Sequence, residues 1–452
     1  MKLLALAYYY PPNAGSGTHR SLYFLNRLAA CGDDITVITA RQQDYAIGTP
    51  VDPELSARAH PGIRIVRAPV RRPLYALLRL RGVLLGQGPH IPVPAAKDGS
   101  PSTDRSRKRA GLAWIKDAIS AALTYPDDHV GWIPGVLRQG SGALRRGCAD
   151  RIYSSGGPWS SHLAAVLLKR RHRVPLILDF RDPWASNPYG RGSIARMLDR
   201  RLEAICIRAA DRVVVNTEPL RQDFVRRYPR EPPAKFTTIT NGFERIVAGE
   251  PRPRSDRFIL VHAGDIYAPR DPACLLQAAV EIIREGSIRP EELVIRFVGG
   301  CSDQPHVVSI LDSAELAGVV EIVPRVPHRK AMEYQLEADA LLLFQNGFPL
   351  QIPRKLFEYL SLLKPVLAIA ERGSATAAVM EESGAGVVAG DAVPTVKQAL
   401  LAMHEAWKRG GRRVEENRIA RYRNDNLAMT LRSVIEEPRS FEAAPLARVH
   451  RA

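Results

Sequence analysis

The chain has 452 residues, 45% of them hydrophobic and 25% charged. This length exceeds what one hydrophobic core usually serves, so we expect a folded protein of two domains. No apolar run approaches the roughly 20 residues of a membrane-spanning helix. The five cysteines are scattered without a C-x-x-C pair, which argues against a disulfide framework or structural zinc and favours a cytoplasmic location.

The charge balance is strongly basic. Lysine and arginine number 64 against 47 acidic residues, which gives a net charge of +17. Such a surplus favours nucleic acid, anionic lipid headgroups or phosphate-bearing substrates as partners. A nucleic-acid-binding protein is the weaker alternative and no nucleic-acid partner is expected, because the sequence has no reader motif and no basic strand face interleaved with aromatic residues.

The first half alternates strands and helices. Residues 1–7 superficially suggest a signal peptide, but the run continues through three tyrosines into Pro11-Pro12 and a glycine-rich segment, which is more typical of a buried first strand. A helix with Leu22, Leu25 and Leu28 on one face follows. Further strands are predicted at residues 3–9, 35–39, 63–66, 176–180 and 212–215.

A second series follows the Pro/Arg-rich residues 249–254, a natural linker. Apolar runs predict strands at residues 258–263, 293–298, 319–323, 340–344 and 366–369, with helices between them. Apolar strands alternating with helices indicate parallel sheets covered on both faces. We therefore predict an α/β protein of two facing Rossmann-like, doubly wound domains, with ligands in the cleft where the carboxyl ends of the strands meet.

The predicted domains are residues 1–248 and residues 256–437, and the last helix is a candidate for packing back on the first domain. Residues 87–110 are rich in Gly, Pro, Ser and basic residues, which predicts a mobile basic loop. Residues 438–452 are expected to form a disordered tail.

Residues 70–81 mix leucines with arginines at helical spacing. An interfacial membrane helix and a helix packed on its own domain are equally compatible with that pattern.

Four motifs in order along the chain carry a family resemblance. They are residues 10–17 with His19-Arg20, residues 154–158 with His162 and residues 179–184, residues 240–243, and residues 353–360 with residues 364–368. Together they resemble the retaining GT-B enzymes of glycosyltransferase family 4, over nearly the whole chain. The second motif resembles a subgroup common among bacterial cell-surface polysaccharide enzymes. The resemblance implies sugar transfer from a nucleotide sugar, such as a UDP- or GDP-sugar, with retained configuration and without a metal or cofactor.

The fourth motif also has a physical reason to bind a nucleotide sugar. A helix that starts near Pro353, with the proline at its first position, directs free N–H groups and partial positive charge toward an anion. Lys355 in its first turn can reach a diphosphate. Glu358 lies three residues later on roughly the same face, and the resemblance implies that it accepts hydrogen bonds from the ribose hydroxyls.

The chain departs from the family pattern at three positions. Leu350 stands where many members have the first of two glutamates. Asp265 follows Gly264 where many have arginine, which leaves Arg270 as the nearest cation. Arg181 replaces a strand-end histidine.

These considerations give three sets of expected site residues. The donor-binding set is Gly264, Arg270, Arg325, Val326, Gln351, Lys355, Leu356 and Glu358. The acceptor-side set is Gly15, Ser16, Gly17, Arg20 and Trp184, and the catalytic set is Asp182, His162 and Arg181. Structural alternatives remain open: Asp182 as a turn residue, Trp184 as core and His162 as a satisfied helix histidine.

The expected acceptor is a polysaccharide, a polyprenol-linked sugar or a small molecule, in cell-envelope polysaccharide synthesis. A polyprenol-linked acceptor would place the protein at the inner face of the cell membrane, with peripheral contact to anionic lipid. The alternative is a nucleotide-sugar hydrolase or epimerase of the same fold. A Rossmann dehydrogenase is disfavoured, because Arg20 stands where the G-x-G-x-x-G motif needs its third glycine.

Overall fold

The computed structural model describes residues 1–71, 124–188, 192–247, 255–266, 270–301, 304–411 and 413–437. The chain forms two compact units. Unit 1 comprises residues 1–214, 228–237 and 428–452, and unit 2 comprises residues 215–227 and 238–427. The predicted linker 249–254, basic loop 87–110, tail from residue 438 and residues 72–81 of the amphipathic segment lie outside the described residues.

Unit 1 is built on a seven-stranded sheet with the order β3-β2-β1-β4-β5-β6-β7. The pairs from β3 through β5 are all parallel. The strands are β1 (Lys2–Leu6), β2 (Asp34–Ala40), β3 (Arg64–Ala68), β4 (Arg151–Gly156), β5 (Leu176–Phe180), β6 (Arg212–Val215) and β7 (Phe236–Thr238). The helices in its described residues include α1 (Ser16–Ala30), α2 (Pro53–Ala57), α5 (Ile133–Arg145), α6 (Ser160–His172) and α7 (Ser193–Ala209).

The strand order of unit 1 reverses between β1 and β4. These two strands are neighbours, and the chain winds outward from them in both directions. Loops that leave a reversal point diverge from each other, which opens a crevice at the carboxyl ends of the strands. The glycine-rich loop before α1 therefore lies at the expected ligand position of this sheet.

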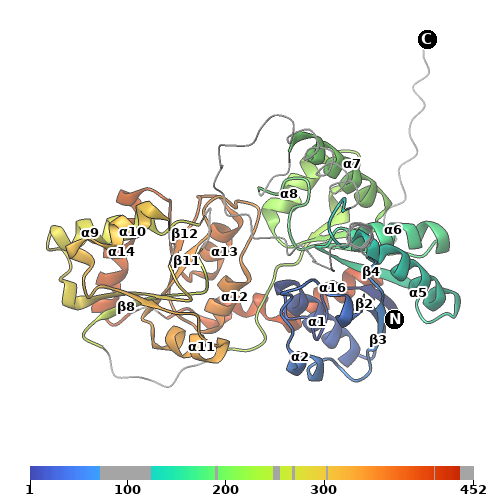
Figure 1. The fold of residues 1–452 in the computed structure, drawn as a ribbon, viewed down its shortest axis with the longest axis horizontal. Coiled ribbons are helices and arrows are strands. Elements are labelled where there is room, and N and C mark those ends of the chain that lie inside the picture. The colour runs from blue at the N-terminus through green and yellow to red at the C-terminus, as the bar shows by residue number, and fades with distance from the viewer. Residues whose placement is uncertain are drawn as a thin grey trace, which may run out of the picture. The chain divides into compact units, whose positions relative to one another are not determined.

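Unit 2 repeats the architecture with a six-stranded sheet in the order β10-β9-β8-β11-β12-β13, and helices cover both of its faces (Figure 1). All of its adjacent strands are parallel. The strands are β8 (Phe258–Ala263), β9 (Leu293–Val298), β10 (Val320–Val323), β11 (Ala340–Phe344), β12 (Val366–Ile369) and β13 (Gly386–Ala389). The helices are α8 (Glu218–Arg227), α9 (Ala273–Arg284), α10 (Pro305–Leu311), α11 (His328–Glu337), α12 (Arg354–Ser361), α13 (Ala375–Ser383), α14 (Val393–Lys408) and α15 (Glu416–Ile419).

Strand β11 shows why the strands of unit 2 are almost entirely apolar. Leu342 and Phe344 belong to the core on one face of the sheet, and Leu341 and Leu343 belong to the core on the other. Successive side chains of a strand point to opposite faces, so a strand covered on both sides must be apolar at every position. The predicted α/β fold of two Rossmann-like parallel-sheet domains is confirmed.

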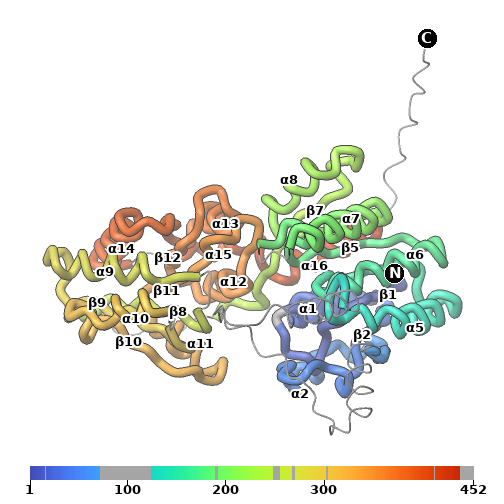
Figure 2. Tube along the Cα trace, turned by 45° about the horizontal axis from the view of Figure 1, so that its top comes forward, coloured from blue at the N-terminus to red at the C-terminus, as the bar shows by residue number. Residues whose placement is uncertain are grey.

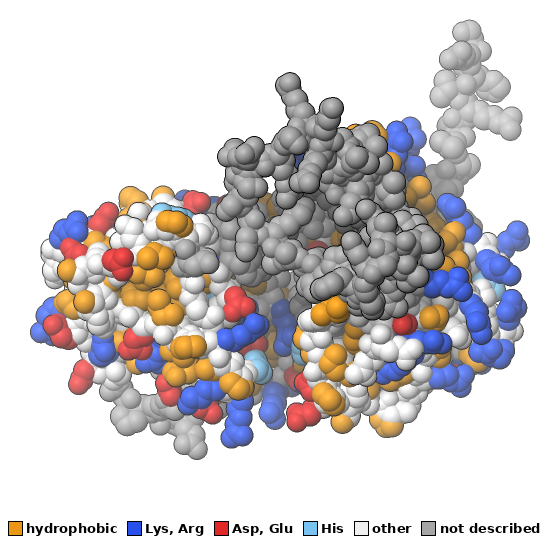
Figure 3. Space-filling model, viewed as in Figure 1, with side chains coloured by type: hydrophobic (Ala, Val, Ile, Leu, Met, Phe, Trp, Pro, Cys, Tyr) orange, Lys and Arg blue, Asp and Glu red, His pale blue; other side chains and the backbone are white. Residues whose placement is uncertain are grey.

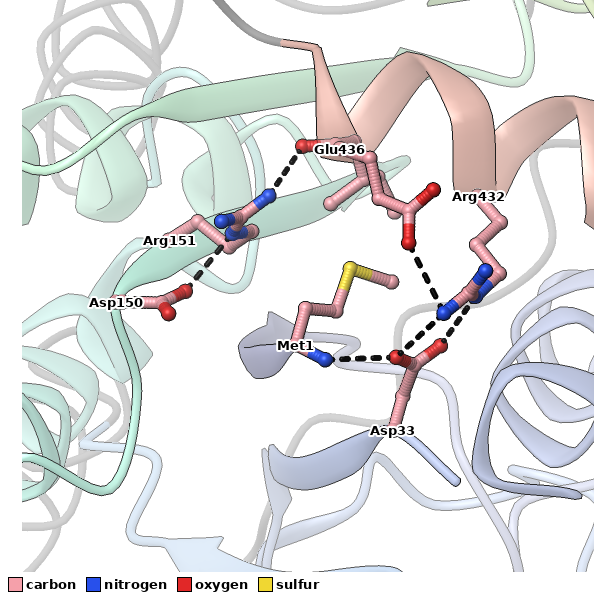
Figure 4. A network of polar contacts seen from close by, with 7 residues as sticks. Met1, Asp33, Asp150, Arg151, Arg432 and Glu436 are labelled. Atoms are coloured by element: carbon pink, nitrogen blue, oxygen red, sulfur yellow. Dashed lines mark hydrogen bonds and ion pairs between the residues drawn. The ribbon is translucent and has the colours of Figure 1, made fainter. Parts of the chain in front are cut away.

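The last helix, α16 (Asn424–Glu436), returns to unit 1 from residue 428 onward. Figure 4 shows its contacts at the amino ends of the strands. Nε of Arg432 donates to a carboxylate oxygen of Asp33 at 3.0 Å, and the N-terminal ammonium of Met1 lies 2.9 Å from the same carboxylate. The guanidinium of Arg151 donates to the carbonyl oxygen of Ile435 at 2.8 Å. These charged contacts attach the helix to the edge of the sheet opposite the crevice.

Every helix within the described ranges is too short or too polar to traverse a lipid bilayer.

Candidate functional site

In unit 2 the strand order reverses between β8 and β11. The loop after β8, the loop after β11 and the start of α12 therefore meet at one edge of the sheet, where ligands bind in doubly wound folds. Helix α12 begins at Arg354, with Pro353 as its N-cap residue at φ −68° and ψ 137°. The sequence predicted proline at the first helical position, so the helix starts one residue later than expected. No side chain caps this helix end, which leaves its first N–H groups available to an anion.

Lys355 is the central cation of this site. Its Nζ lies 3.4 Å from Nε2 of His262, a buried residue of β8. The other ring nitrogen of His262 faces the carbonyl oxygen of Leu342 at 3.0 Å; since a carbonyl only accepts, that nitrogen carries the proton. Nε2 is thus free to accept a hydrogen bond from the ammonium. Burial and the charge of Lys355 hold the pKa of His262 well below its usual value, so the ring stays neutral.

Burial, with help from the nearby Arg270, lowers the pKa of Lys355 from 10.5 to about 8. The carboxylates of Glu358 and Asp265 only partly oppose this shift. A buried ammonium beside another cation is an unfavourable arrangement for the free protein. A bound diphosphate would offset the repulsion between the two cations. A cation with such a shifted pKa is therefore a candidate anion-binding group.

Gly264, directly after β8, lets the backbone pass close to this lysine. Its φ is +115°, and a Cβ at this position would lie 2.6 Å from Nζ of Lys355. Any larger residue would therefore meet both a strained backbone and the ammonium group. The structure thus brings Gly264 and Lys355 together, as the donor-binding set expected.

Arg270 adds a second cation beside the end of β11. Its guanidinium donates to Oε1 of Gln345 at 2.9 Å and lies 5.8 Å from the ring centroid of Phe348. Gln345 is buried as the first residue after β11. The hydrogen bond to Gln345 orients the guanidinium at the end of β11.

Glu358 lies one turn along α12 from Lys355. Its Oε1 accepts a hydrogen bond from Nε2 of Gln335 in α11 at 3.2 Å. Glu358 is half-buried, so its carboxylate remains partly accessible to solvent. The next residue, Tyr359, is fully buried and its hydroxyl accepts a hydrogen bond from the backbone N–H of Ala263 at 3.2 Å. That bond ties α12 to the end of β8 and fixes the spacing of the site.

The other members of the donor-binding set have different environments. Leu356 is fully buried in the core, so its side chain is structural. Arg325 is exposed and its guanidinium lies 3.6 Å from the carboxylate of Asp265. Val326 and Gln351 are half-buried.

In unit 1 a buried ionic network lies at the carboxyl end of β5. Nε and Nη2 of Arg20 donate to the two carboxylate oxygens of Asp179, each at 2.9 Å. The hydroxyl of Tyr153 donates to the same carboxylate at 2.6 Å. All three residues are buried. Arg20, expected on the acceptor side, therefore lies in the interior and joins α1 to β5; it supports the loop rather than facing a ligand.

Arg181 lies between two loops at the carboxyl ends of β1 and β4. Its Nε donates to the carbonyl oxygen of Gly156 at 2.6 Å, and its Nη2 donates to that of Gly157. A Cβ on Gly17 would lie 1.9 Å from Nη1 of Arg181. The glycine thus permits the guanidinium to sit against the start of α1. Gly15 is the N-cap residue of α1, and Ser16 is its first residue.

Two of the remaining expected residues are core residues. His162 is fully buried, its Nδ1 lies 3.0 Å from Oγ of Ser154, and burial lowers its pKa to about 3. A neutral ring with no exposed surface does not reach a substrate, so His162 is a positioning residue and not a member of the catalytic set. Trp184 is also buried; its ring stacks on Trp159 at 5.0 Å and its Nε1 donates to Asp199 at 3.0 Å.

Asp182 remains a candidate for contact with substrate. Its side chain is exposed to solvent, yet loss of solvation within the surrounding protein raises its pKa, against the opposing charges of Arg181 and Arg20. A carboxyl with a raised pKa keeps its proton to a higher pH than an ordinary aspartate does, which is a property of a general acid.

Sequence reasoning missed His262, Gln345 and Gln335, which orient Lys355, Arg270 and Glu358 respectively. A signal for two of them was present. His262 interrupts an apolar strand, and Gln345 directly follows one, and a polar residue within or at the end of a buried strand marks the ligand edge of a sheet. Gln335 lies in a polar helix and carries no such signal. Among the described residues, no group of three His, Cys, Asp or Glu side chains is placed to hold a metal ion.

Two Rossmann-like parallel sheets, each with a reversal of strand order, define the GT-B fold class. Residues 16–242 match the model of the "Glycosyl transferase 4-like domain" family. The match spans half of the chain, and the chain belongs to this family. The matched residues end before the strands and helices that form the Lys355 site.

Curated relatives point to the same family. A D-inositol 3-phosphate glycosyltransferase 2 of Catenulispora acidiphila is 29% identical over 226 residues, which is 46% of this chain and 52% of that protein. A D-inositol 3-phosphate glycosyltransferase of Kineococcus radiotolerans is 26% identical over 196 residues, 40% of this chain and 44% of that protein. The chain thus aligns with about half the length of these relatives.

Solved structures share the fold over the whole chain. The sucrose-phosphate synthase of Thermosynechococcus elongatus superposes with a TM-score of 0.59 at 13% identity, covering 97% of this chain and 99% of that one. HepE of Anabaena, solved with UDP, superposes with a TM-score of 0.55 at 13% identity, covering 96% and 95%. At these identities the likeness shows the GT-B fold alone.

Proposed function

We propose that the chain transfers a sugar from a nucleotide sugar to an acceptor, with the donor held by unit 2. The observation that carries the proposal is the arrangement of Lys355, Arg270 and the start of α12 around the end of β8. Two cations and a helix start would bind the diphosphate and stabilise the negative charge that develops on it as the sugar leaves. This arrangement supplies the charge that a bound metal ion supplies in other enzymes, so we propose that transfer needs no metal ion.

Glu358 is the proposed partner of the ribose. An ionised carboxylate accepts two hydrogen bonds from neighbouring hydroxyl groups, and these bonds are stronger than those between neutral groups. Gln335 holds one oxygen of Glu358 from α11, which restricts the rotation of the carboxylate. The solved HepE structures contain UDP, UDP and glucose, or UDP-glucose, and this supports a uridine diphosphate sugar as the first donor to test, followed by GDP-sugars.

Unit 1 is the proposed acceptor side, through the loop that contains Gly15 and Gly17 and through Asp182. We also propose retention of configuration and a role in cell-envelope polysaccharide synthesis, on the resemblance of the four sequence motifs, and a cytoplasmic location, on the scattered cysteines. The acceptor class is a carbohydrate or a polyprenol-linked sugar. The curated relatives are named for D-inositol 3-phosphate, so inositol phosphate belongs in the acceptor panel.

The proposal is tested by calorimetric titration of the full chain with UDP, GDP and their sugar derivatives, followed by transfer assays with a panel of acceptors. Binding of one nucleotide sugar, with release of nucleoside diphosphate only when acceptor is present, supports transfer. Release of free sugar or of an epimer without acceptor would instead identify a nucleotide-sugar hydrolase or epimerase. Transfer that persists in EDTA supports the metal-independent arrangement.

A further inference from the structure

The charges of helix α7 in unit 1 are sorted between its two faces. Its two acidic residues, Asp199 and Glu203, are buried. Asp199 accepts hydrogen bonds from Tyr125 and Trp184, and Glu203 accepts them from the backbone of Ala185 and from Tyr228. The basic residues of the helix all lie on its exposed side: Arg196, Arg200, Arg201 and Arg208.

Helices α5 and α6 extend the same basic surface, and they run side by side (Figure 2). Neither helix contains an acidic residue. Their exposed cations are Arg138, Arg145, Arg170 and Arg171. Arg170 lines both the groove between α5 and α6 and the groove between α6 and α7, so the three helices present one continuous surface. Basic side chains gather over α5 and α6 at the right-hand edge of Figure 3.

Apolar side chains stand exposed among these arginines. Ile194, Met197 and Ile205 of α7 are 73%, 47% and 39% exposed, and Leu167 of α6 is 43% exposed. The positions 194, 197, 201, 205 and 208 recur at spacings of three and four residues, so they share one side of α7. A helix normally turns its apolar stripe toward the core. The exposed stripe of α7 therefore lacks a partner within the described part of the chain.

We infer that the outer surface of α5, α6 and α7 docks on an anionic lipid surface. Exposed arginines attract the headgroups, and the apolar side chains between them enter the boundary between headgroups and acyl chains, as in interfacial helices. The net charge of +17 acts in the same direction. This surface is made of other residues than 70–81, which the sequence singled out as a lipid-binding candidate.

A lipid surface fits these side chains better than a nucleic acid does. Proteins that bind single strands combine cations with aromatic rings on which bases stack. Helices α5, α6 and α7 contain no Phe, Tyr or Trp. Their exposed apolar groups are aliphatic, and burial of aliphatic groups in the interface is favourable by roughly 25 cal/mol per Å². The inference does not depend on the donor site in unit 2, and a lipid-linked acceptor would give the docking a purpose.

The test is co-sedimentation of the full-length protein with vesicles of phosphatidylcholine, alone or mixed with phosphatidylglycerol. The wild-type protein is expected to bind the mixed vesicles and not the neutral ones. Arg170→Gln with Arg171→Gln should lower the partition constant at least about tenfold, because each cation near an anionic surface contributes about 1 kcal/mol. Ile194→Ser with Met197→Ser should lower it by roughly tenfold without any change in charge.

The matched control is Arg226→Gln with Arg329→Gln. It also removes two positive charges, but from exposed positions outside unit 1. Asp223 keeps Arg227 as a partner in this control. Thermal unfolding of each variant checks that it folds. If the variant with Arg170→Gln and Arg171→Gln does not fold, the variant with Ile194→Ser and Met197→Ser provides the test. The inference is overturned if wild-type protein ignores anionic vesicles, or if the control loses as much binding as the arginine pair. Competition with single-stranded RNA gives a further test. The inference is also overturned if RNA displaces the vesicles from the wild-type protein while the variant with Ile194→Ser and Met197→Ser binds RNA and vesicles as the wild type does.

Discussion

The ammonium of Lys355 lies 3.4 Å from Nε2 of His262, and no carboxylate forms an ion pair with this lysine within the described ranges. A neutral ring that accepts from an ammonium fixes its position without cancelling its charge. The ammonium of Lys355 therefore lies at the carboxyl ends of the strands with its charge not neutralised. Its burial and the nearby Arg270 make this position unfavourable for the free protein.

Lys355→Met should weaken the binding of UDP or GDP, whichever the protein binds, by about 10- to 100-fold, since a hydrogen bond to a charged group contributes roughly 1.5–3 kcal/mol. Calorimetric titration measures the change. The control is Lys330→Met, which removes an exposed ammonium that pairs with Glu333 at 2.8 Å. Equal affinities of wild type and Lys355→Met would remove Lys355 from the phosphate site.

The same substitution should make the free protein more stable near neutral pH. The pKa of Lys355 is about 8 in the folded protein and 10.5 as its ordinary value, so keeping the ammonium charged below pH 8 costs the folded state on the order of 1–3 kcal/mol. Methionine removes that cost. Urea denaturation at pH 7 should show a higher free energy of unfolding for Lys355→Met, and a large loss of stability would contradict this.

The pH dependence has a definite sign. Between pH 8 and 10.5 the unfolded chain still binds the proton that folded Lys355 has released, so this group favours folding increasingly as pH rises. The stability advantage of Lys355→Met should therefore shrink above pH 8. Nucleotide affinity of the wild type should fall through the same range, because the neutral amine no longer attracts the diphosphate. An affinity that stays flat from pH 7 to 9.5 would argue against an ammonium–diphosphate contact.

Gly17→Ala should abolish most transferase activity, because its Cβ would lie 1.9 Å from the Arg181 guanidinium and would displace it. The matched control is Gly192→Ala, where a Cβ meets nothing within 4 Å. In an Arg181→Ala background the same alanine should have little further effect, giving a coupling of about 0.5–3 kcal/mol between the two positions. Additive losses in the double variant would show that Gly17 acts independently of Arg181.

Asp179→Asn should destabilise the protein by about 3–5 kcal/mol, because it leaves the buried Arg20 without its counter-charge. Asp150→Asn is the comparison, since Asp150 pairs with Arg151 at the surface and such pairs contribute about 0–1 kcal/mol. Chemical denaturation gives both values. Similar small losses for the two variants would mean that the Arg20–Asp179 pair is solvated in solution.

Much of the fold was predictable from the sequence. The strands at residues 176–180, 258–263, 340–344 and 366–369 have the predicted bounds, because a strand buried on both faces is a continuous apolar run. Strands β4 and β7 and the edge strand β13 were not predicted. Strand β4 contains two serines and a glycine at its ligand end, and β7 has only 3 residues, so neither has the apolar run that identifies a strand.

The candidate site was predictable where a motif and a helix start coincide, as at Lys355 and Glu358. It was not predictable where distant residues pair. Arg20 is bound by Asp179, which is 159 positions away, and nothing local in either segment reveals that partner. For the same reason Trp184 and His162 were candidates in sequence and are core residues in the structure: motif position indicates the strand end, whereas burial depends on the packing of α6 and α7.

The most direct test of the donor site compares UDP and GDP with their 2′-deoxy analogues, titrated into wild-type protein and into Glu358→Gln. If Glu358 holds the ribose, the wild type should prefer the ribonucleotide by about 10- to 100-fold, the range expected for a hydrogen bond to a charged group. Glu358→Gln should bind the two forms almost equally. An undiminished preference in Glu358→Gln would contradict the assignment of this edge of unit 2 as the nucleotide-sugar site.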